Sequence, residues 1–173
     1  NPTNDVNVTD NEIGLEYGKC YRIQNVCGER LGYQQGASYQ YGNPDHQVFQ
    51  VCLTATGNCL REGKADQKVE SRNLFYLYDT RGSSWSKGPT NIGFYGLYLY
   101  PNIYPNRPDL MARFQAWKDC DEVDEGEPCP LAVNLKGAYN NWNGLANTPA
   151  YGYVMQVANA YETVHWVFKE VKN

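Results

Sequence analysis

Three short segments of this chain share one pattern, in which an aromatic residue lies in the middle of an alternating apolar run. They are HQVFQVC at 46–52, RFQAWKDC at 113–120 and VHWVFKEV at 164–171. Runs of a second kind begin near Tyr21, Tyr76 and Val133, about 55 residues apart, and each leads to a turn that contains glycine. A repeat of this length indicates units that bury their hydrophobic faces only against one another. We therefore expect three units, at about 18–71, 72–129 and 130–173.

The apolar residues have the periodicity of strands rather than that of helices. No window keeps helical spacing for three turns, because Gly, Pro and Asn interrupt almost every one. Short aromatic and β-branched runs lie between the turns, at 21–26, 74–79, 95–100 and 152–157. In two of these runs, alternation predicts that Phe75, Leu77, Leu97 and Leu99 face inward and that the tyrosines between them face outward.

Three such units closed about an axis make a β-trefoil, which is the fold that we predict. The 173 residues suffice for one domain with its own core, at 17–173, and residues 1–16 read as a polar N-terminal tail. The middle unit must then carry an insertion, most naturally at 101–109. The alternatives are a two-layer β-sandwich and a lipocalin-like barrel.

Several features favour a secreted protein. Six cysteines, an even number, fit an oxidising compartment, and neither a Cys-x-x-Cys pair nor a histidine cluster suggests zinc. The chain begins at Asn1 rather than Met, and no apolar run is as long as a membrane span, as expected for a processed chain without membrane insertion. The sequon NVT predicts glycosylation at Asn7. A net charge of −4 argues against a nucleic-acid or anionic-membrane surface.

The spacing of the cysteines restricts their pairing. Cys20 and Cys27 flank an extended run whose ends lie roughly 20 Å apart, which is too far for a disulfide between them. Cys52 and Cys59 have the same spacing, so two antiparallel strands would pair Cys20 with Cys59 and Cys27 with Cys52, the arrangement that we prefer. The alternative is a local Cys52–Cys59 bridge over the turn TATGN.

The third predicted bridge is independent of this choice. Cys120 and Cys129 flank the acidic loop DEVDEGEP, and a bridge between them would close it. We therefore expect all six cysteines to be oxidised.

The 15 tyrosines point to a binding surface as well as to strands. Sugars are bound by aromatic platforms, with Asn, Asp or Gln side chains meeting their hydroxyl groups. The segments YQYGNPD and YLYPNIYPN combine these residue types, and so does YNNWNG at 139–144, although Asn, Gly and Pro also simply make turns. The predicted ligand-binding residues are Tyr39, Tyr41, Asn43, Asp45, Tyr98, Tyr100, Asn102 and Asn106.

Residues suited to catalysis are scarce. His46 follows Asn-Pro-Asp and His165 lies within the last strand, so both read as structural histidines. The carboxylates at 119–127 match no EF-hand spacing and favour a solvated acidic turn over a calcium site. We therefore expect no enzymatic activity, no cofactor and no bound metal.

Two motifs resemble a known family. Gln115–Trp117 resembles the Gln-x-Trp signature of ricin-B-type β-trefoil lectins, Gln47–Phe49 resembles a second copy, and Val164–Trp166 resembles a third copy that lacks the glutamine. The segment GKCYRIQNVCGERLG is similar to the first hairpin of fungal trefoil proteins. The resemblance covers about residues 17–172 and implies a ligand site ahead of the Gln-x-Trp strand.

The resemblance also implies that the motif tryptophan is structural. We expect Trp117 and Trp166 to be core residues and Trp142 to be partly exposed. The leading functional hypothesis is a secreted carbohydrate-binding protein that performs no chemistry. The first alternative is a secreted fungal effector or protease inhibitor that acts through protein contacts, with PNIYPNRPDLM at 101–111 as its loop, and the second is a hydrolase.

Overall fold

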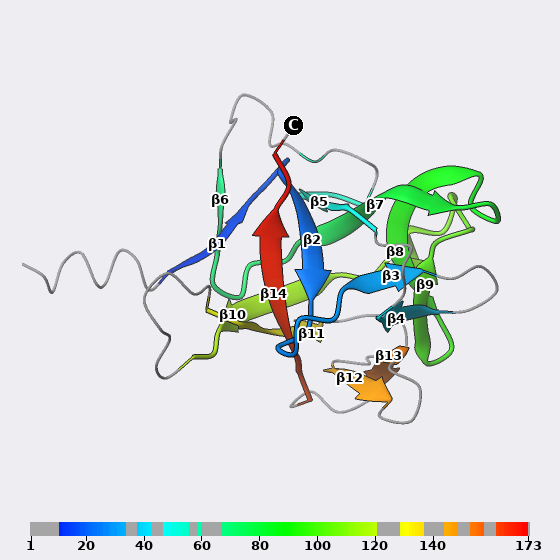
Figure 1. The fold of residues 1–173 in the computed structure, drawn as a ribbon. Helices are drawn as coiled ribbons and strands as arrows, with labels where there is room; N and C mark the ends of the chain where they lie inside the picture. Colours follow the sequence, from blue (N-terminus) through cyan, green and yellow to red (C-terminus); the bar gives the residue numbers. More distant parts are fainter. Residues whose placement is uncertain are drawn as a thin grey trace, which may run out of the picture.

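The structure, a computed structural model, describes residues 11–33, 38–42, 47–55, 59, 67–120, 129–136, 144–148, 153–157 and 162–172. These residues form an all-β fold with one 3-10 turn, η1 (Pro108–Leu110), and without an α-helix in the described part of the chain (Figure 1). The strands are β1 (Glu12–Glu16), β2 (Cys20–Gln24), β3 (Leu31–Tyr33), β4 (Tyr39–Tyr41), β5 (Phe49–Cys52), β6 (Lys68–Glu70), β7 (Tyr76–Ser83), β8 (Gly88–Tyr95), β9 (Tyr98–Pro101), β10 (Phe114–Lys118), β11 (Leu131–Leu135), β12 (Gly144–Thr148), β13 (Tyr153–Val157) and β14 (Val164–Glu170). The prediction of an all-β chain is confirmed.

Six strands pair in a closed ring. Antiparallel pairing gives the order β10, β11, β14, β2, β5, β7. Phe75, directly before β7, and Phe114 of β10 exchange two backbone hydrogen bonds, with N···O distances of 3.0 and 2.8 Å. This bridge joins the first strand of the order to the last, so the six strands close on themselves.

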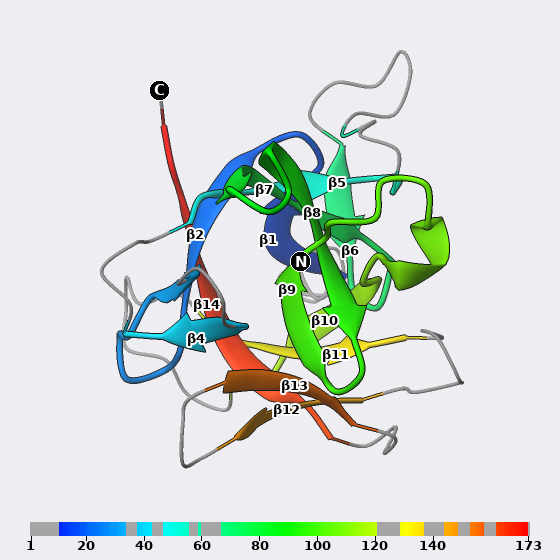
Figure 2. The ribbon, with the colours of Figure 1, turned by 90° about the vertical axis from the view of Figure 1, so that its right-hand side faces the viewer.

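Three hairpins lie together at one end of the ring. They are β3–β4, β8–β9 and β12–β13, and all three face the viewer in Figure 2. Strand β13 pairs with both β4 and β9, through Tyr153 with Gln40 and Met155 with Tyr98. The hairpins therefore contact one another as well as the strands from which they arise.

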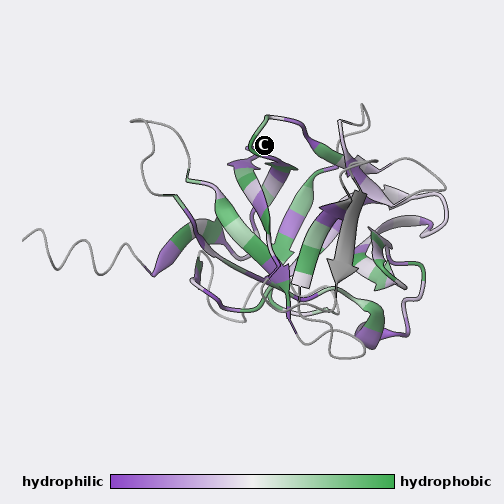
Figure 3. Cartoon of the chain, turned by 90° about the horizontal axis from the view of Figure 1, so that it is seen from below, coloured by the Kyte–Doolittle hydropathy of each residue, from purple (hydrophilic) through white to green (hydrophobic). Residues whose placement is uncertain are grey.

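The core follows from alternation along these strands, which is visible as alternating colours in Figure 3. Phe75 and Leu77 are fully buried, whereas the tyrosines that alternate with them are half-buried, as predicted. Leu99 is also buried, but Leu97 is exposed, so its prediction is wrong. Leu97 belongs to the two-residue turn between β8 and β9, where strand alternation no longer applies.

The two tryptophans predicted in the core differ. Trp166 is fully buried, as predicted. Trp117 is only half-buried, and the Arg72 guanidinium lies over its ring, 4.1 Å from Cζ to the centroid. Alternation is the reason: Phe114 and Ala116 of β10 face the core, so Gln115 and Trp117 face outward. Trp142 lies outside the described residues.

The N-terminal segment contributes to the core, contrary to prediction. Residues 12–16, which the sequence placed in a polar tail, form β1, and β1 pairs with β6. Ile13 and Leu15 on one face of β1 are buried in the hydrophobic core. The glutamates at both ends of β1 and the glycine between these two positions concealed the strand. Asn7 lies outside the described residues.

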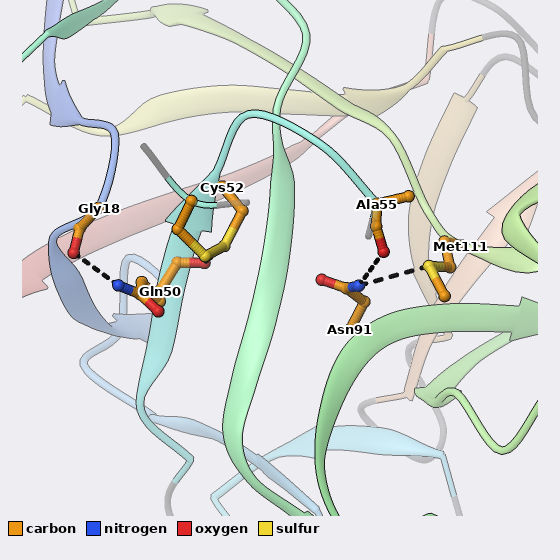
Figure 4. Close-up of a disulfide and its surroundings, with 7 residues drawn as sticks. Gly18, Gln50, Cys52, Ala55, Asn91 and Met111 are labelled. Atoms are coloured by element: carbon orange, nitrogen blue, oxygen red, sulfur yellow. Dashed lines mark hydrogen bonds between the residues drawn. A yellow bond between two sulfur atoms is a disulfide. The ribbon is translucent and has the colours of Figure 1, made fainter. Parts of the chain in front are cut away.

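Two disulfides are present, Cys52–Cys59 and Cys120–Cys129. The second was predicted and is confirmed. The preferred pairs Cys20–Cys59 and Cys27–Cys52 are wrong, and the local alternative is correct (Figure 4). The register of β2 against β5 explains the difference. Cys20 lies opposite Gln50, so the position opposite Cys52 precedes Cys20 in the chain, whereas Cys27 follows the end of β2.

Cys20 and Cys27 are therefore free thiols, and the prediction that all six cysteines are oxidised is wrong. Cys27 is exposed in the turn after β2, whereas Cys20 is only partly exposed, and burial raises the pKa of its thiol.

We expect alkylation of the native protein to label these two cysteines and no others. Cys27 should react faster, because thiolate formation and access both favour an exposed thiol. Peptide mapping without reduction would measure the alkylation rates of both thiols and identify both disulfides. A native protein with no reactive thiol would contradict this arrangement.

Replacing both Cys120 and Cys129 with Ser removes the bridge between them and should lower the free energy of unfolding by about 2–3 kcal/mol.

Candidate functional site

The first predicted ligand set begins with a residue that the structure places in the core. Tyr39 is fully buried, and its hydroxyl donates to Asp79 Oδ2 over 2.7 Å. Burial, with the neighbouring Asp79 carboxylate, holds the pKa of Tyr39 well above its usual value. Tyr39 therefore offers no surface to a ligand, and its prediction as a binding residue is wrong. Asn43 and Asp45 lie outside the described residues.

The hydroxyl group of Tyr41 is also bonded within the protein. Its hydroxyl accepts a hydrogen bond from Trp166 Nε1 over 2.6 Å and donates to Asn147 Oδ1 over 3.1 Å. Burial raises the pKa of Tyr41 to about 12. Both hydrogen-bonding functions of the phenol are thus used within the protein, and Tyr41 acts as a link between the core tryptophan and strand β12.

The second predicted set falls on the β8–β9 hairpin and gathers four tyrosines. Tyr95 lies directly opposite Tyr98 in the register of the two strands, and Tyr100 lies two residues further along the same face of β9. Tyr95, Tyr98 and Tyr104 are 67 %, 43 % and 41 % exposed, an unusual concentration of aromatic surface. We call Tyr95, Tyr98, Tyr100 and Tyr104 the tyrosine cluster.

Tyr100 occupies the interior of the tyrosine cluster. Its hydroxyl oxygen is buried and has no hydrogen-bond partner in the described part of the chain. Burial, together with the neighbouring Tyr104 and Tyr95, raises the pKa of Tyr100 to about 12. A neutral phenol with unused hydrogen-bonding capacity therefore lies among three exposed rings.

The segment after β9 folds back over the hairpin and completes this surface. Asn102 is buried, and its side chain binds the backbone of Tyr104 at both ends, so it is a turn residue rather than the predicted ligand contact. Gly93 lies beneath the segment, and a Cβ there would approach the Leu110 carbonyl oxygen to 2.9 Å. Met111 bridges to Gly93, which fixes the far end.

Polar groups border the tyrosine cluster on this segment. Asn106, a predicted site residue, is exposed. Arg107 Nε and Nη2 bind the two carboxylate oxygens of Asp109 over 2.9 and 2.7 Å, and this lowers the pKa of Asp109. The inserted segment is therefore a docked flank of the β8–β9 hairpin, although residues 104–109 keep exposed side chains.

Sequence reasoning missed Tyr95 and left Tyr104 out of the predicted site. A signal for Tyr95 was present, since YGLY at 95–98 places two tyrosines on either side of a two-residue turn. Gly96, with φ of 62°, provides the left-handed backbone that such turns require. Recognition of this turn would have paired Tyr95 with Tyr98.

The Gln-x-Trp glutamine is structural. Gln115 Nε2 donates to the Arg72 carbonyl over 2.9 Å, at a residue whose φ is 68°. Gln50 makes the same contact with Gly18, over 2.8 Å at φ of 90° (Figure 4). Gln50, rather than Gln47 of the predicted copy at Gln47–Phe49, therefore makes the same contact as Gln115.

Gln47 belongs instead to a buried polar group centred on Asp79. The Asp79 carboxylate is fully buried and accepts hydrogen bonds from Tyr39 Oη, Gln47 Nε2 and the backbone amides of Arg81 and Gly82. Donors surround the carboxylate, so its role is to hold β4, β5 and β7 together.

A further polar contact joins a histidine to an aspartate. His165 Nε2 and Asp119 Oδ2 are 2.6 Å apart, and both side chains are exposed on the outer face of the ring. Within the described residues, no group of three or more His, Cys, Asp or Glu side chains could hold a metal ion. His46 lies outside the described ranges.

An open pocket of about 340 Å³ lies between β1 and the ends of β10, β11 and β14. Lys118, Glu12 and the apolar ring of Phe168 are among the residues that line this pocket. Ile13 and Leu15 line it but are at most 5 % exposed. These two side chains thus offer a ligand little surface. The tyrosine cluster is the stronger candidate.

No described helix has the length and apolar composition needed to cross a membrane. Comparison of the sequence with protein-family models and with curated proteins finds no match.

Proposed function

We propose that this chain is a β-trefoil protein related in architecture to the ricin-B-type lectins. The closed ring supports this proposal, because its strands pair in a repeating order. Within each predicted unit the first and last strands face each other through buried pairs: Tyr21 with Phe49, Phe75 with Phe114, and Val133 with Val164. Each unit also contributes one hairpin to the same end. Gln50 and Gln115 each donate a hydrogen bond to the backbone carbonyl of a residue with positive φ, which is further support.

We also propose that the protein is secreted and binds carbohydrate through the tyrosine cluster, without a chemical step. The observation that carries this proposal is the set of three exposed tyrosine rings on one hairpin, bordered by polar side chains. Aromatic faces bind the C–H faces of sugars, and the nearby Asn106 and the Arg107–Asp109 pair offer donors and acceptors to hydroxyl groups. Two disulfides are compatible with an extracellular location.

We expect Tyr98→Ala and Tyr104→Ala each to weaken glycan binding by tenfold or more while leaving the fold intact. A shallow site that buries so little surface should bind a monovalent sugar at roughly millimolar to high-micromolar Kd. A broad glycan array, followed by calorimetric titration of the best ligand, would measure the effect.

Leu74→Ala is the matched control, because Leu74 is exposed to a similar degree but lies outside the tyrosine cluster. Tyr41→Ala is unsuitable as a probe, because it removes the acceptor of the Trp166 indole and should destabilise the fold. If no glycan on the array binds, or if both tyrosine variants bind as tightly as the unaltered protein, the carbohydrate proposal fails.

A further inference from the structure

A second exposed aromatic residue lies away from the tyrosine cluster. Trp85 is 61 % exposed in the four-residue turn that joins β7 to β8, and this hairpin extends to the right-hand side of Figure 1. Strand β8 separates the turn from the tyrosine cluster, and its eight residues span roughly 25 Å. We call Ser84–Lys87 the hairpin tip. An indole held in water is a large apolar surface without a partner in the described structure.

Hydrogen bonds across the base of the hairpin tip hold its conformation. Ser86 Oγ donates to the Gly88 carbonyl over 2.7 Å and accepts from the Ser83 amide over 2.9 Å. The Ser86 amide in turn donates to Ser83 Oγ over 3.1 Å. Lys87, at φ of 59°, closes the turn with a bond from its amide to the Ser84 carbonyl. Trp85 is thus carried on a turn that is ordered before any partner binds.

The buried Asp79 carboxylate anchors the hairpin below its tip. It accepts the backbone amides of Arg81 and Gly82 over 3.0 and 2.9 Å, and Gln47 Nε2 donates to the Gly82 carbonyl over 3.1 Å. A Cβ at Gly82 would lie only 1.9 Å from the Gly88 carbonyl oxygen, so the two strands cross more closely than any side chain permits. A fully buried side chain thus fixes the direction of this hairpin.

The sequence around the hairpin tip carries charge of one sign. Lys87 is exposed two residues from Trp85, and residues 80–90 contain no acidic residue, although the whole chain carries a net charge of −4. A partner that contacts Trp85 therefore meets a basic side chain, and a carboxylate near the contact would complement it.

We propose that the hairpin tip is a protein-docking element, in which Trp85 enters an apolar pocket of an acidic partner protein. Rigid, exposed tryptophans surrounded by polar residues are the typical anchors of protein interfaces, because burial of the indole supplies much of the binding energy and little entropy is lost. A membrane is a poorer partner, since a single indole on a serine-rich turn provides too little apolar surface for stable insertion. This contact lies outside the proposed carbohydrate site.

A selection of disulfide-constrained random peptides against the intact protein tests the proposal. Such libraries supply apolar and acidic side chains in many geometries. We expect the enriched peptides to combine Asp or Glu with large apolar residues. Their affinity, measured by surface plasmon resonance, should fall at least 30-fold with Trp85→Ala and about threefold to tenfold with Lys87→Ala. The Lys87 effect should shrink in high salt.

Two further variants separate anchoring from exposure. Ser86→Ala leaves Trp85 in place but removes the hydroxyl that bridges Ser83 and Gly88, so it should weaken binding at least threefold through loss of preorganisation. Val26→Ala, at a residue exposed to a similar degree in another turn, should change nothing. Peptides that bind the Trp85→Ala protein unchanged, or a failure to enrich any peptide, would overturn the proposal. So would Trp85-dependent binding to vesicles of phosphatidylcholine and phosphatidylserine in place of peptides.

Discussion

Replacing Trp166 with alanine should lower the free energy of unfolding by about 3–5 kcal/mol, the range observed for large aromatic residues in well-packed cores. The indole is fully buried and packs against Phe114 and Phe168, with ring centroids 5.9 and 6.0 Å away. Alanine would leave a cavity among these rings. It would also leave Tyr41 Oη without its indole donor. Equilibrium unfolding in urea would measure the loss.

Trp85→Ala is the matched control for Trp166→Ala, since it removes the same side chain from an exposed position. Its free energy of unfolding should change by no more than about 0.5 kcal/mol. Trp166→Phe should fall between the two, because phenylalanine fills part of the space but cannot donate to Tyr41. Equal effects of Trp166→Ala and Trp85→Ala would contradict the placement of Trp166 in the core.

Asp79→Ala should also destabilise the protein by about 3–5 kcal/mol, because it leaves several buried donors without an acceptor. Those donors are Tyr39 Oη, Gln47 Nε2 and the amides of Arg81 and Gly82. A buried N–H or O–H that loses its partner retains the full cost of its desolvation. The change should in addition loosen the β7–β8 hairpin, which hydrogen exchange at Arg81 and Gly82 would report.

Tyr39→Phe is the companion variant, since it removes one of these donors and leaves the carboxylate with its other partners. It should cost about 1 kcal/mol, the usual contribution of a single hydrogen bond. An Asp79→Ala protein as stable as the Tyr39→Phe protein would mean that Asp79 does not organise this region.

The all-β character of the chain could be predicted because it depends on local sequence. Alternation alone buries Phe75 and Leu77, and turn residues interrupt any helical pattern. Cys120–Cys129 was predictable for the same reason, since it closes a single loop. The β8–β9 tyrosines were partly predictable, because Tyr98 and Tyr100 precede a polar segment of matching composition.

Strand register and the direction of each side chain were decided only by the tertiary structure. The register that places Cys20 opposite Gln50 excluded the preferred disulfides, and it is Gln50 rather than Gln47 that makes the same backbone contact as Gln115. Composition counts Tyr39 and Tyr98 alike, yet the first lies against Asp79 in the interior and the second on the surface. A one-residue change of register moves a side chain from one face of a sheet to the other, and long-range pairing alone fixes that register.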